Sequence, residues 1–524
     1  MIPLTAEEVA GALGISRFPE AVTGVSTDTR SLVPGDLFVA LRGERSDGHL
    51  HVAEALARGA VAALVESAWA KARGGLLREE AGAPSSEQAE ALGRVVPVPD
   101  TFRALGALGL AVRRRSGCRV IAVTGSVGKT GTKDLIAGMV SRELQVLATR
   151  ANENNEVGVP QTLLRIDTST ECVVVEMGMR GPGQIAELAA IAEPDVGVIT
   201  NVAPVHLELL GSVYAIGQAK VELIQGLPEH GVGVAPAGNP LLDELLANED
   251  RRRIVRFAVG ASATGTDIVG RVVPGEGVEQ ILEIRWPEGQ ASVVFPFSGA
   301  HRIENAVCAA AACYAAGLSL ERCLPGVQSV ALTGGRGDEH LVGGIRLVDD
   351  SYNANPVAVA GALADLVTSS RSKGGRTVAV LGDMLELGPQ AAEYHYQIGG
   401  LAARLGIAVL FGVGSLSEYT VNGFADQSGE PGRKAGSPDE AQVGEVFAKA
   451  LQTALAVAGD TGAAAGAQGE SRLFDASGEC VEALAQALRE GDHVLVKGSR
   501  GMRLEEVVQS LLARLKAERQ GLLS

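Results

Sequence analysis

The sequence predicts an α/β protein of three domains. The alternation of strand-like and helical patterns, the length of the chain and its composition support this prediction. Short apolar runs alternate with helical patterns along almost the whole chain, which is typical of parallel sheets covered by helices. The 524 residues suit three domains at roughly 150 residues each. Only 3% of the residues are aromatic, so the cores must consist of Ala, Val, Leu and Ile, which favours helices packed on parallel strands.

The apolar runs are the predicted strands. They lie at 37–41, 61–65, 119–125, 172–178, 196–202, 345–350, 377–383, 407–414 and 493–499. Because the carboxyl ends of parallel strands meet at one edge of a sheet, we expect the functional residues just after these runs.

Changes in composition give the expected domains as 1–100, 101–331 and 332–524. Near residue 331 a helical pattern ends and a new series of strands begins. Segment 67–94 is rich in small, charged and turn-forming residues, and segment 416–470 holds two similar stretches around a short helical pattern. Such segments are typical of loops, so we expect both to be excursions on the surface.

The net charge of −16 argues against a protein that binds nucleic acid through its phosphates, because such binding needs a basic surface. Anionic ligands must then be held at local sites by backbone amides and a few cations.

The cysteines and the N-terminus indicate a cytoplasmic protein. Six cysteines are scattered without any Cys-x-x-Cys pair, as expected of reduced thiols in a reducing compartment. Residues 1–14 carry acidic side chains where a secretion signal would carry basic ones. No apolar run approaches the roughly 18 residues of a membrane span, so we expect no transmembrane segment.

A glycine loop between a predicted strand and a predicted helix indicates a phosphate site. The segment 119–140 reads RVIAVTGSVGKTGTKDLIAGMV. Backbone amides of such a loop bind phosphate, a following lysine bridges the β- and γ-phosphates, and a hydroxyl binds Mg²⁺. The loop is shorter than the common G-x-x-x-x-G-K-[ST] pattern, and the alternative is an ordinary glycine turn. The predicted nucleotide-binding residues are Gly125, Ser126, Gly128, Lys129 and Thr130.

Magnesium needs more oxygen ligands than Thr130 supplies. Glu176 ends an apolar run, where an unpaired charge would be costly to bury, and His206 follows the next predicted strand. Both are candidate metal ligands. Each also has an ordinary alternative, because Glu176 could be a solvated strand end and His206 a hydrogen-bonded loop residue.

Several segments together resemble the Mur ligases. Those that carry the resemblance are TGSVGKTGTKD, NENNEVGVPQTLL, EMGMRGPGQI, NVAPVHLELLGSVYAIGQAKVELI, GAHRIENAV, DDSYNANP, LGDMLELG and VKGSRGMRLEEVV. Segment 26–49 resembles the uridine-nucleotide domain that the MurE and MurF branches share. DDSYNANP and LGDMLELG favour the MurF branch, and the Asp-Asn-Pro-Arg motif of the MurE branch does not occur.

The resemblance implies a role for each expected domain. Residues 1–100 would bind the UDP-muramoyl peptide, 101–331 would be the P-loop ATPase, and 332–524 would be a Rossmann-like domain for the incoming dipeptide. The implied activity is an ATP-dependent amide ligase that joins D-alanyl-D-alanine to UDP-N-acetylmuramoyl-tripeptide through an acyl phosphate. This reaction belongs to cytoplasmic peptidoglycan precursor synthesis, and thus to cell shape and division. The implied cofactors are ATP and two Mg²⁺, and the expected state is a monomer.

The resemblance also implies roles for single residues of the ATPase site. Glu176 and His206 would hold metal. Lys220 would be carbamylated, although the helical pattern alone would make it a solvated lysine. Arg336 would reach the γ-phosphate from the domain junction. Asp350 would accept hydrogen bonds from the ribose.

Asn305 would lie in the adenine pocket, in the first turn of a helix. Three residues before it the sequence departs from the usual Gly-x-His-Asn-x-x-Asn pattern, because Arg302 stands where the first asparagine is expected. We therefore expect the contact with adenine to differ. The implied substrate-binding residues are Thr29, Arg45, Ser46 and Asp47 for the uridine nucleotide, Asn154 and Asn155 near the transferred phosphate, and Ser499 facing the incoming substrate.

Two other functions remain open. A MurE-type ligase would add a diamino acid to UDP-muramoyl-dipeptide. A P-loop switch protein would hydrolyse nucleotide to drive a partner, but that alternative leaves the uridine-type segment and DDSYNANP unexplained.

Overall fold

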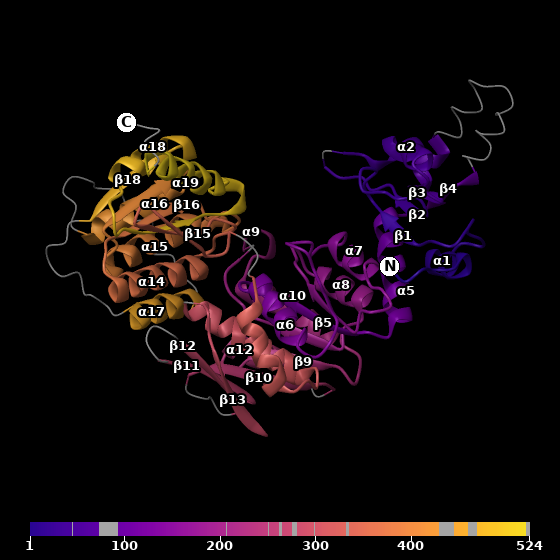
Figure 1. Ribbon diagram of the computed structural model, residues 1–524, viewed down its shortest axis with the longest axis horizontal. Coiled ribbons are helices and arrows are strands. Elements are labelled where there is room, and N and C mark those ends of the chain that lie inside the picture. The colour runs from indigo at the N-terminus through magenta and orange to yellow at the C-terminus, as the bar shows by residue number, and fades with distance from the viewer. Residues whose placement is uncertain are drawn as a thin grey trace.

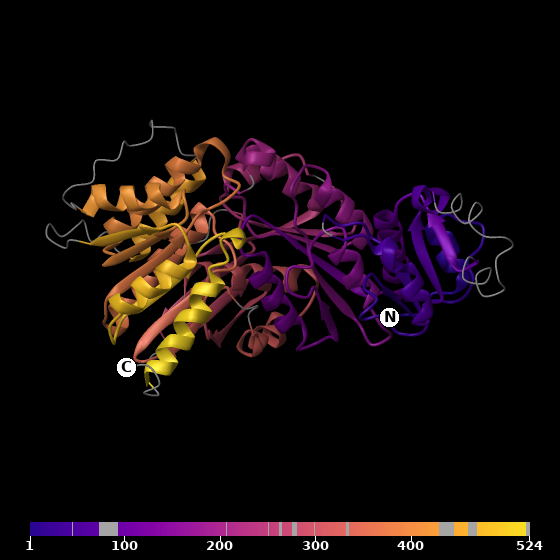
Figure 2. The same cartoon turned by 90° about the horizontal axis from the view of Figure 1, so that it is seen from above.

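The computed structural model describes residues 1–44, 46–72, 93–205, 207–249, 251–260, 265–274, 280–297, 299–331, 335–428, 445–458 and 469–519. Over these residues the chain forms three sheets, each with its own helices. The three bodies lie in a row, with the nine-stranded sheet between the other two (Figures 1 and 2).

The N-terminal body is a parallel sheet in the order β1-β2-β3-β4. Thr5 and Glu8 begin its first helix with a capping box, each side chain accepting a hydrogen bond from the other residue's amide. The elements are α1 (Ala6–Leu13), β1 (Gly24–Ser26), β2 (Asp36–Val39), η1 (Gly48–His51), α2 (Val52–Ala57), β3 (Ala62–Glu66) and β4 (Val95–Val98).

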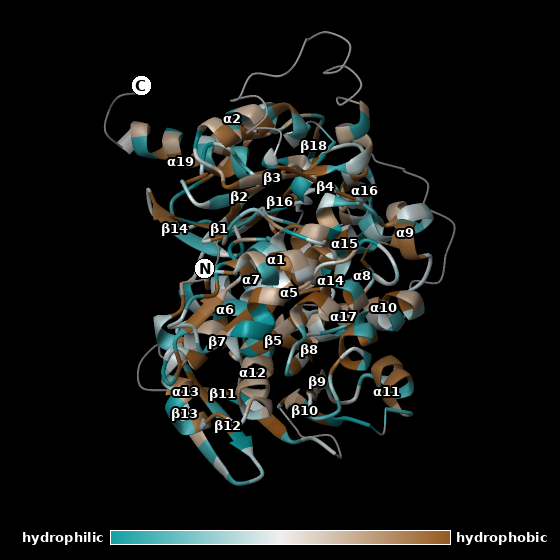
Figure 3. Ribbon diagram, turned by 90° about the vertical axis from the view of Figure 1, so that its right-hand side faces the viewer, coloured by the Kyte–Doolittle hydropathy of each residue, from teal (hydrophilic) through white to brown (hydrophobic). Residues whose placement is uncertain are grey.

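The central body is built on the sheet β13-β12-β11-β10-β9-β8-β5-β7-β6, which is parallel from β6 to β11. Its strands are β5 (Arg119–Thr124), β6 (Val146–Ala148), β7 (Cys172–Glu176), β8 (Val196–Ile199), β9 (Val232–Pro236), β10 (Arg253–Val259), β11 (Ile268–Pro274), β12 (Gln280–Trp286) and β13 (Gly289–Val294). The antiparallel β12–β13 hairpin mixes hydrophilic and hydrophobic residues (Figure 3), as expected where one face of a sheet meets solvent.

Helices cover both faces of the central sheet. Along β5, Val120 and Ala122 pack toward α5, α8 and α10, whereas Ile121 and Val123 pack toward α6 and α12, because successive strand residues point to opposite faces. The helices are α5 (Thr101–Ser116), α6 (Lys129–Val140), α7 (Gly158–Leu164), α8 (Gln184–Ala192), α9 (Leu207–Leu210), α10 (Val213–Gln225), α11 (Pro240–Leu246), α12 (Ala300–Ala315), α13 (Leu320–Cys323) and η2 (Leu324–Ser329).

The C-terminal body is the sheet β14-β15-β19-β16-β17-β18, parallel except for the edge strand β14. One face packs against α14, α15 and α16, with α17 lying on α14 and α15, and the other face packs against α18 and α19. The elements are β14 (Asp338–Val342), β15 (Ile345–Asp350), α14 (Pro356–Lys373), β16 (Thr377–Gly382), η3 (Gly388–Gln390), α15 (Ala391–Leu405), β17 (Val409–Val413), α16 (Ser417–Ser428), α17 (Glu445–Ala458), β18 (Glu470–Phe474), α18 (Ser477–Ala487), β19 (His493–Lys497), η4 (Arg500–Met502) and α19 (Glu505–Arg519).

The fold class and all the predicted strands are confirmed. The expectation that 416–470 is a surface excursion is wrong for its described part. Helix α16 packs against α15 and buries Phe424, and α17 packs against α14 and buries Phe447. Small residues there permit close helix packing, which composition alone does not distinguish from a loop. Residues 429–444 and 459–468, and most of the other segment (73–92), lie outside the described residues.

Two further expectations concern the cysteines and membrane-spanning helices. All six cysteines are buried free thiols. Over the described ranges, no helix combines the length and the apolar character needed to cross a membrane.

A buried arginine ties α5 to the central sheet. Arg113 donates to the carbonyls of Ala192, Cys118 and Glu193, and its Nη2 lies 3.1 Å from the Asp195 carboxylate. Its neighbour Arg114 pairs with Glu193 at the surface. The Arg113 and Arg114 side chains are 11% and 63% exposed. Arg114 therefore serves as the exposed control for the buried Arg113.

We predict that Arg113→Ala lowers the free energy of unfolding by about 3 kcal/mol, because it removes the ion pair of Asp195 and the donor to three carbonyls. Arg114→Ala should cost less than about 1 kcal/mol, because solvent screens its ion pair. Urea unfolding of the two variants measures both values. Equal losses would contradict the structural role of Arg113.

Candidate active site

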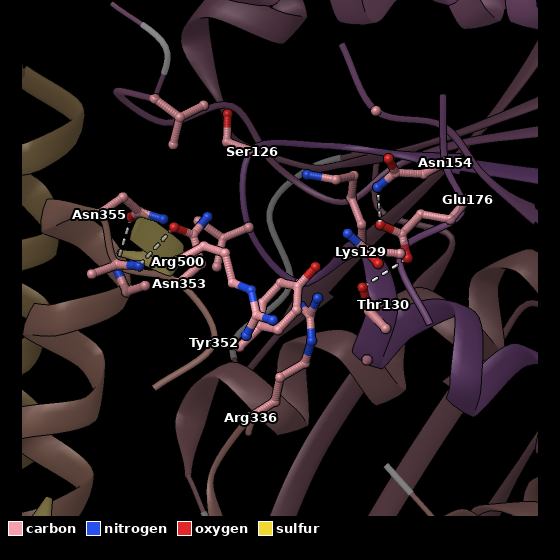
Figure 4. A pocket seen from close by; sticks show the side chains of 18 of the residues that line it. Ser126, Lys129, Thr130, Asn154, Glu176, Arg336, Tyr352, Asn353, Asn355 and Arg500 are labelled. Atoms are coloured by element: carbon pink, nitrogen blue, oxygen red, sulfur yellow. Dashed lines mark hydrogen bonds between the residues drawn. The ribbon is translucent and has the colours of Figure 1, made fainter. Parts of the chain in front are cut away.

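A cavity of about 780 Å³ lies between the central and C-terminal bodies. The glycine loop and the ends of β7 and β8 line one side, and the segments after β15 and β19 line the other. Figure 4 shows side chains from both bodies pointing into it. The carboxyl ends of strands from two different sheets thus face one space, as expected for α/β domains.

The glycine loop runs from the end of β5 to the start of α6. Gly128 has φ +82°, and a Cβ there would lie 2.3 Å from Asn305 Oδ1, so both backbone and space require glycine. The Ser126 hydroxyl accepts from the Ala203 amide and donates to the Ala203 carbonyl, at 2.9 and 3.0 Å. Asn201 Oδ1 accepts from the Val127 amide at 2.9 Å. The segment after β8 therefore fixes the loop.

Lys129 begins α6 inside the cavity. Its Nζ donates to the Gly125 carbonyl at 2.8 Å. Burial lowers the pKa of Lys129, the Glu176 carboxylate opposes that shift, and the charge of Arg336 adds to it, so the pKa lies below its usual value. A bound anion would favour the charged form again.

Glu176, at the end of β7, contacts both the first turn of α6 and the segment that precedes α7. Its two carboxylate oxygens accept from the Thr130 hydroxyl and from Asn154 Nδ2, each at 2.7 Å (Figure 4). Glu176 is 1% exposed, which excludes the solvated strand end. Asn155 lies beside this chain of contacts and accepts from the Gly158 amide at the start of α7.

Lys220 lies on the buried face of α10 and is 2% exposed. The alternative of a solvated helix lysine is therefore wrong. Burial, and to a lesser extent the charge of Lys129, lowers the pKa of Lys220 well below its usual value. Among the described residues, no carboxylate forms an ion pair with Lys220.

Two arginines from the C-terminal body stand over one aromatic ring. The Arg336 guanidinium lies 3.9 Å from the centroid of the Tyr352 ring, and that of Arg500 lies 5.6 Å from it. Arg336 Nε is buried without a hydrogen-bond partner among the described residues. The backbone of Arg336 is held by Arg302 of α12, whose Nη2 donates to its carbonyl at 2.9 Å.

The ends of β15 and β19 carry an ion pair. Lys497 Nζ lies 2.6 Å from Asp350 Oδ2 and donates to the Asn353 carbonyl at 3.0 Å. Ser499 follows on the same strand end. Its hydroxyl accepts from the Leu385 amide at 2.9 Å, so it holds the segment after β16 against the cavity.

Comparisons with known proteins identify the family. Three family models match: "Mur ligase family, catalytic domain" at residues 21–113, "Mur ligase middle domain" at 123–313, and "Mur ligase, glutamate ligase domain" at 336–500. The chain belongs to the Mur ligase family. Its members are ligases, so the cavity between the bodies is the candidate active site of a Mur ligase enzyme.

Individual relatives match this Mur ligase over nearly its full length. It is 34% identical to UDP-N-acetylmuramoyl-tripeptide–D-alanyl-D-alanine ligase of Synechocystis, over 94% of this chain and 92% of that protein. The protein of the same name from Escherichia coli is 33% identical over 93% of each chain. A crystal structure of MurF from Acinetobacter baumannii superposes with a TM-score of 0.75 at 26% identity, covering 98% of this chain and 99% of that one.

The structure brings most of the predicted residues of this Mur ligase to one cavity. It is lined by Ser126, Gly128, Lys129, Thr130, Asn154, Asn155, Glu176, Asn305, Arg336, Asp350 and Ser499. Asn305 is in the second turn of α12 and not the first, because the helix begins at Ala300. His206 lies outside the described residues.

The predicted uridine-nucleotide residues lie elsewhere, in the N-terminal body. Thr29 is buried, and the backbone of Ser46 closes a turn with Gly43. The Asp47 carboxylate accepts from the His49 amide and lies near Arg42. Arg45 lies outside the described residues, and the roles of all four residues remain predictions.

Sequence reasoning missed Tyr352, Lys497 and Arg500 as members of the site. All three lie inside the segments DDSYNANP and VKGSRGMRLEEVV that carried the resemblance. A lysine at the end of an apolar strand run was the available signal for Lys497, because such a charge needs a partner when it is buried.

We predict that Lys497→Met lowers the free energy of unfolding of the Mur ligase by about 3 kcal/mol, because it leaves Asp350 unpaired in a largely buried position. The Lys497 side chain is 4% exposed. The exposed Lys449 of α17 is the control, and Lys449→Met should leave stability within about 0.5 kcal/mol. Denaturant unfolding measures both, and an unchanged midpoint for Lys497→Met would refute the role of the pair.

Proposed function

We propose that this Mur ligase joins D-alanyl-D-alanine to UDP-N-acetylmuramoyl-tripeptide at the expense of ATP. One observation carries the proposal: Lys129 on the glycine loop and Arg336 of the C-terminal body line the same cavity. The names of relatives 31–34% identical over more than nine-tenths of the chain support the choice of substrates.

The phosphates of ATP would lie on the glycine loop. Its backbone amides and the start of α6 supply partial positive charge there, and Lys129 would exchange the Gly125 carbonyl for the β- and γ-phosphates. Asp350 would accept from the ribose hydroxyls with the oxygen that Lys497 leaves free. Asn305, packed against the loop at Gly128, would lie near the adenine.

The residues around Glu176 suit Mg²⁺. Its carboxylate and the Thr130 hydroxyl are hard oxygen donors in contact with each other, which is the chemistry that Mg²⁺ prefers. A carbamate on Lys220 would add a further anionic donor, and His206 stays a predicted ligand. When bound, Mg²⁺ would neutralise phosphate charge; two ions are proposed.

The reaction would run in two steps. The terminal carboxylate of the tripeptide attacks the γ-phosphorus of ATP, and the bond to the β-γ bridging oxygen breaks, which gives an acyl phosphate and ADP. The amine of the dipeptide then attacks the acyl carbon, loses a proton, and phosphate leaves. Lys129 and Arg336 would offset the charge that gathers on the transferred phosphate. The position of the cavity between two bodies lets closure exclude water from the acyl phosphate.

The incoming dipeptide would lie against the C-terminal body. Its amine must reach the acyl carbon while its carboxylate needs a cation. Among the described cations of the cavity on that body, Arg336 serves the phosphate and Lys497 serves Asp350. Arg500 is exposed, and among the described residues its ion pair is with Glu505, so it remains for the carboxylate.

The N-terminal body would hold the uridine nucleotide through Thr29 and the Arg45–Asp47 loop. A cytoplasmic location suits the buried free thiols. The second candidate, a ligase that adds a diamino acid to the dipeptide precursor, keeps the same ATP chemistry and differs only in the two acceptors.

Phosphate release from ATP tests the proposal. With UDP-muramoyl tripeptide, we expect release to depend on D-alanyl-D-alanine and not on a free diamino acid, because only the dipeptide completes the second step. Release with UDP-muramoyl dipeptide and a diamino acid would contradict the proposal and favour the second candidate.

We predict a carbamate on Lys220, because its lowered pKa leaves a neutral amine that adds carbon dioxide. Carbon NMR with labelled bicarbonate should show a carbamate signal in the wild type and in Lys133→Met, a control that removes another buried lysine. The signal should vanish in Lys220→Met and fall as acid protonates the amine. An unchanged signal in Lys220→Met would contradict the modification.

A further inference from the structure

Arg302 reaches from the central body to the backbone that carries Arg336. Its Nη2 donates to the carbonyl of Arg336 at 2.9 Å and to that of Gly337 at 2.8 Å. Gly337 has φ +85°, and a Cβ there would lie 2.3 Å from the same nitrogen. The contact is therefore close on both sides and needs glycine at 337.

The helix that carries Arg302 also touches the glycine loop. Asn305 stands three residues later on α12, on the same helical face, and it packs against Gly128 of the loop and Gly131 of α6. Two adjacent turns of one helix thus contact both the loop that ends in Lys129 and the segment that carries Arg336. The start of α12 is fixed to the C-terminal body as well, since Asp365 accepts from the Ala300 amide at 3.2 Å.

Charge explains why such a support is needed. Lys129 and Arg336 bring like charges into one cavity, and each disfavours the other until a polyanion separates them. Arg302 contacts only the backbone of Arg336, whose guanidinium lies over the Tyr352 ring and whose Nε has no hydrogen-bond partner among the described residues. Hydrogen bonds from a charged donor are stronger than those between neutral groups, so two of them can hold the Arg336 backbone against this repulsion.

We propose that Arg302 is a positioning residue that holds Arg336 toward the phosphate side of the cavity. Arg302 then acts through Arg336, and the Arg302 guanidinium does not contact the nucleotide base. The inference rests on the proposed function for its kinetic consequence, but not for the contact itself.

Amide hydrogen exchange in the protein without nucleotide tests the contact. In Arg302→Ala the amides of residues 335–338 should exchange at least about tenfold faster, because two charge-assisted bonds are lost. Arg302→Lys should keep part of the protection, since an ammonium still donates. The matched control is Arg256→Ala, which removes another half-buried arginine that donates to a carbonyl of the central body, Pro236, and it should leave this exchange unchanged. Unchanged exchange in Arg302→Ala overturns the inference, whatever the protein catalyses.

Kinetics test the consequence. Arg302→Ala should lower kcat about tenfold with little change in the KM for ATP, and Arg302→Lys should restore part of the loss. In an Arg336→Ala background, Arg302→Ala should cost nothing further, because its effect passes through Arg336. An equal loss in both backgrounds, or a raised KM for ATP with a changed preference between ATP and GTP, would mean a direct role and overturn the inference. If Arg302→Ala speeds amide exchange but the wild-type protein shows no dipeptide-dependent turnover, the proposed function alone would be refuted.

Discussion

Lys129 and Arg336 bring two positive charges from different bodies of the protein to one cavity, and such charges repel unless an anion lies between them. The whole chain carries a net charge of −16, but this repulsion is local, and the Glu176 carboxylate opposes it at Lys129. The pKa of buried Lys220 falls mainly because of burial and to a lesser extent because of the charge of Lys129. An anionic ligand such as a nucleotide polyphosphate would offset both charges, whereas a neutral ligand would not.

The fold meets this constraint with rigid elements. The glycine loop is braced by the segment after β8 and by Asn305, and Glu176 links Thr130 to Asn154 across two strand ends. On the other body, Lys497 and Asp350 pair across neighbouring strands. Helix α12 spans the junction, with Arg302 and Asn305 one turn apart. Each group of side chains is therefore held by strand ends and helix starts rather than by long loops.

Local patterns predicted the strands, the glycine loop and the candidate ligands, because burial on both faces makes parallel strands continuously apolar. They failed where a long-range contact decides the outcome. Nothing local separates Lys220 from a solvated helix lysine, since its burial comes from the sheet that α10 covers. The small residues of α16 look like a loop until α15 lies against them. Ser126 and Ser499 carry hydroxyls that bind neighbouring segments, and only their partners, distant in sequence, reveal this.

The central claim is that phosphate passes from ATP to a substrate carboxylate between these two bodies. It is tested most directly with UDP-muramoyl tripeptide whose terminal carboxylate carries a heavy oxygen isotope. If an acyl phosphate forms, each turnover transfers one labelled oxygen to the released phosphate, which mass spectrometry detects. Phosphate that takes its new oxygen from water, with all of the label left on the peptide, would contradict the account.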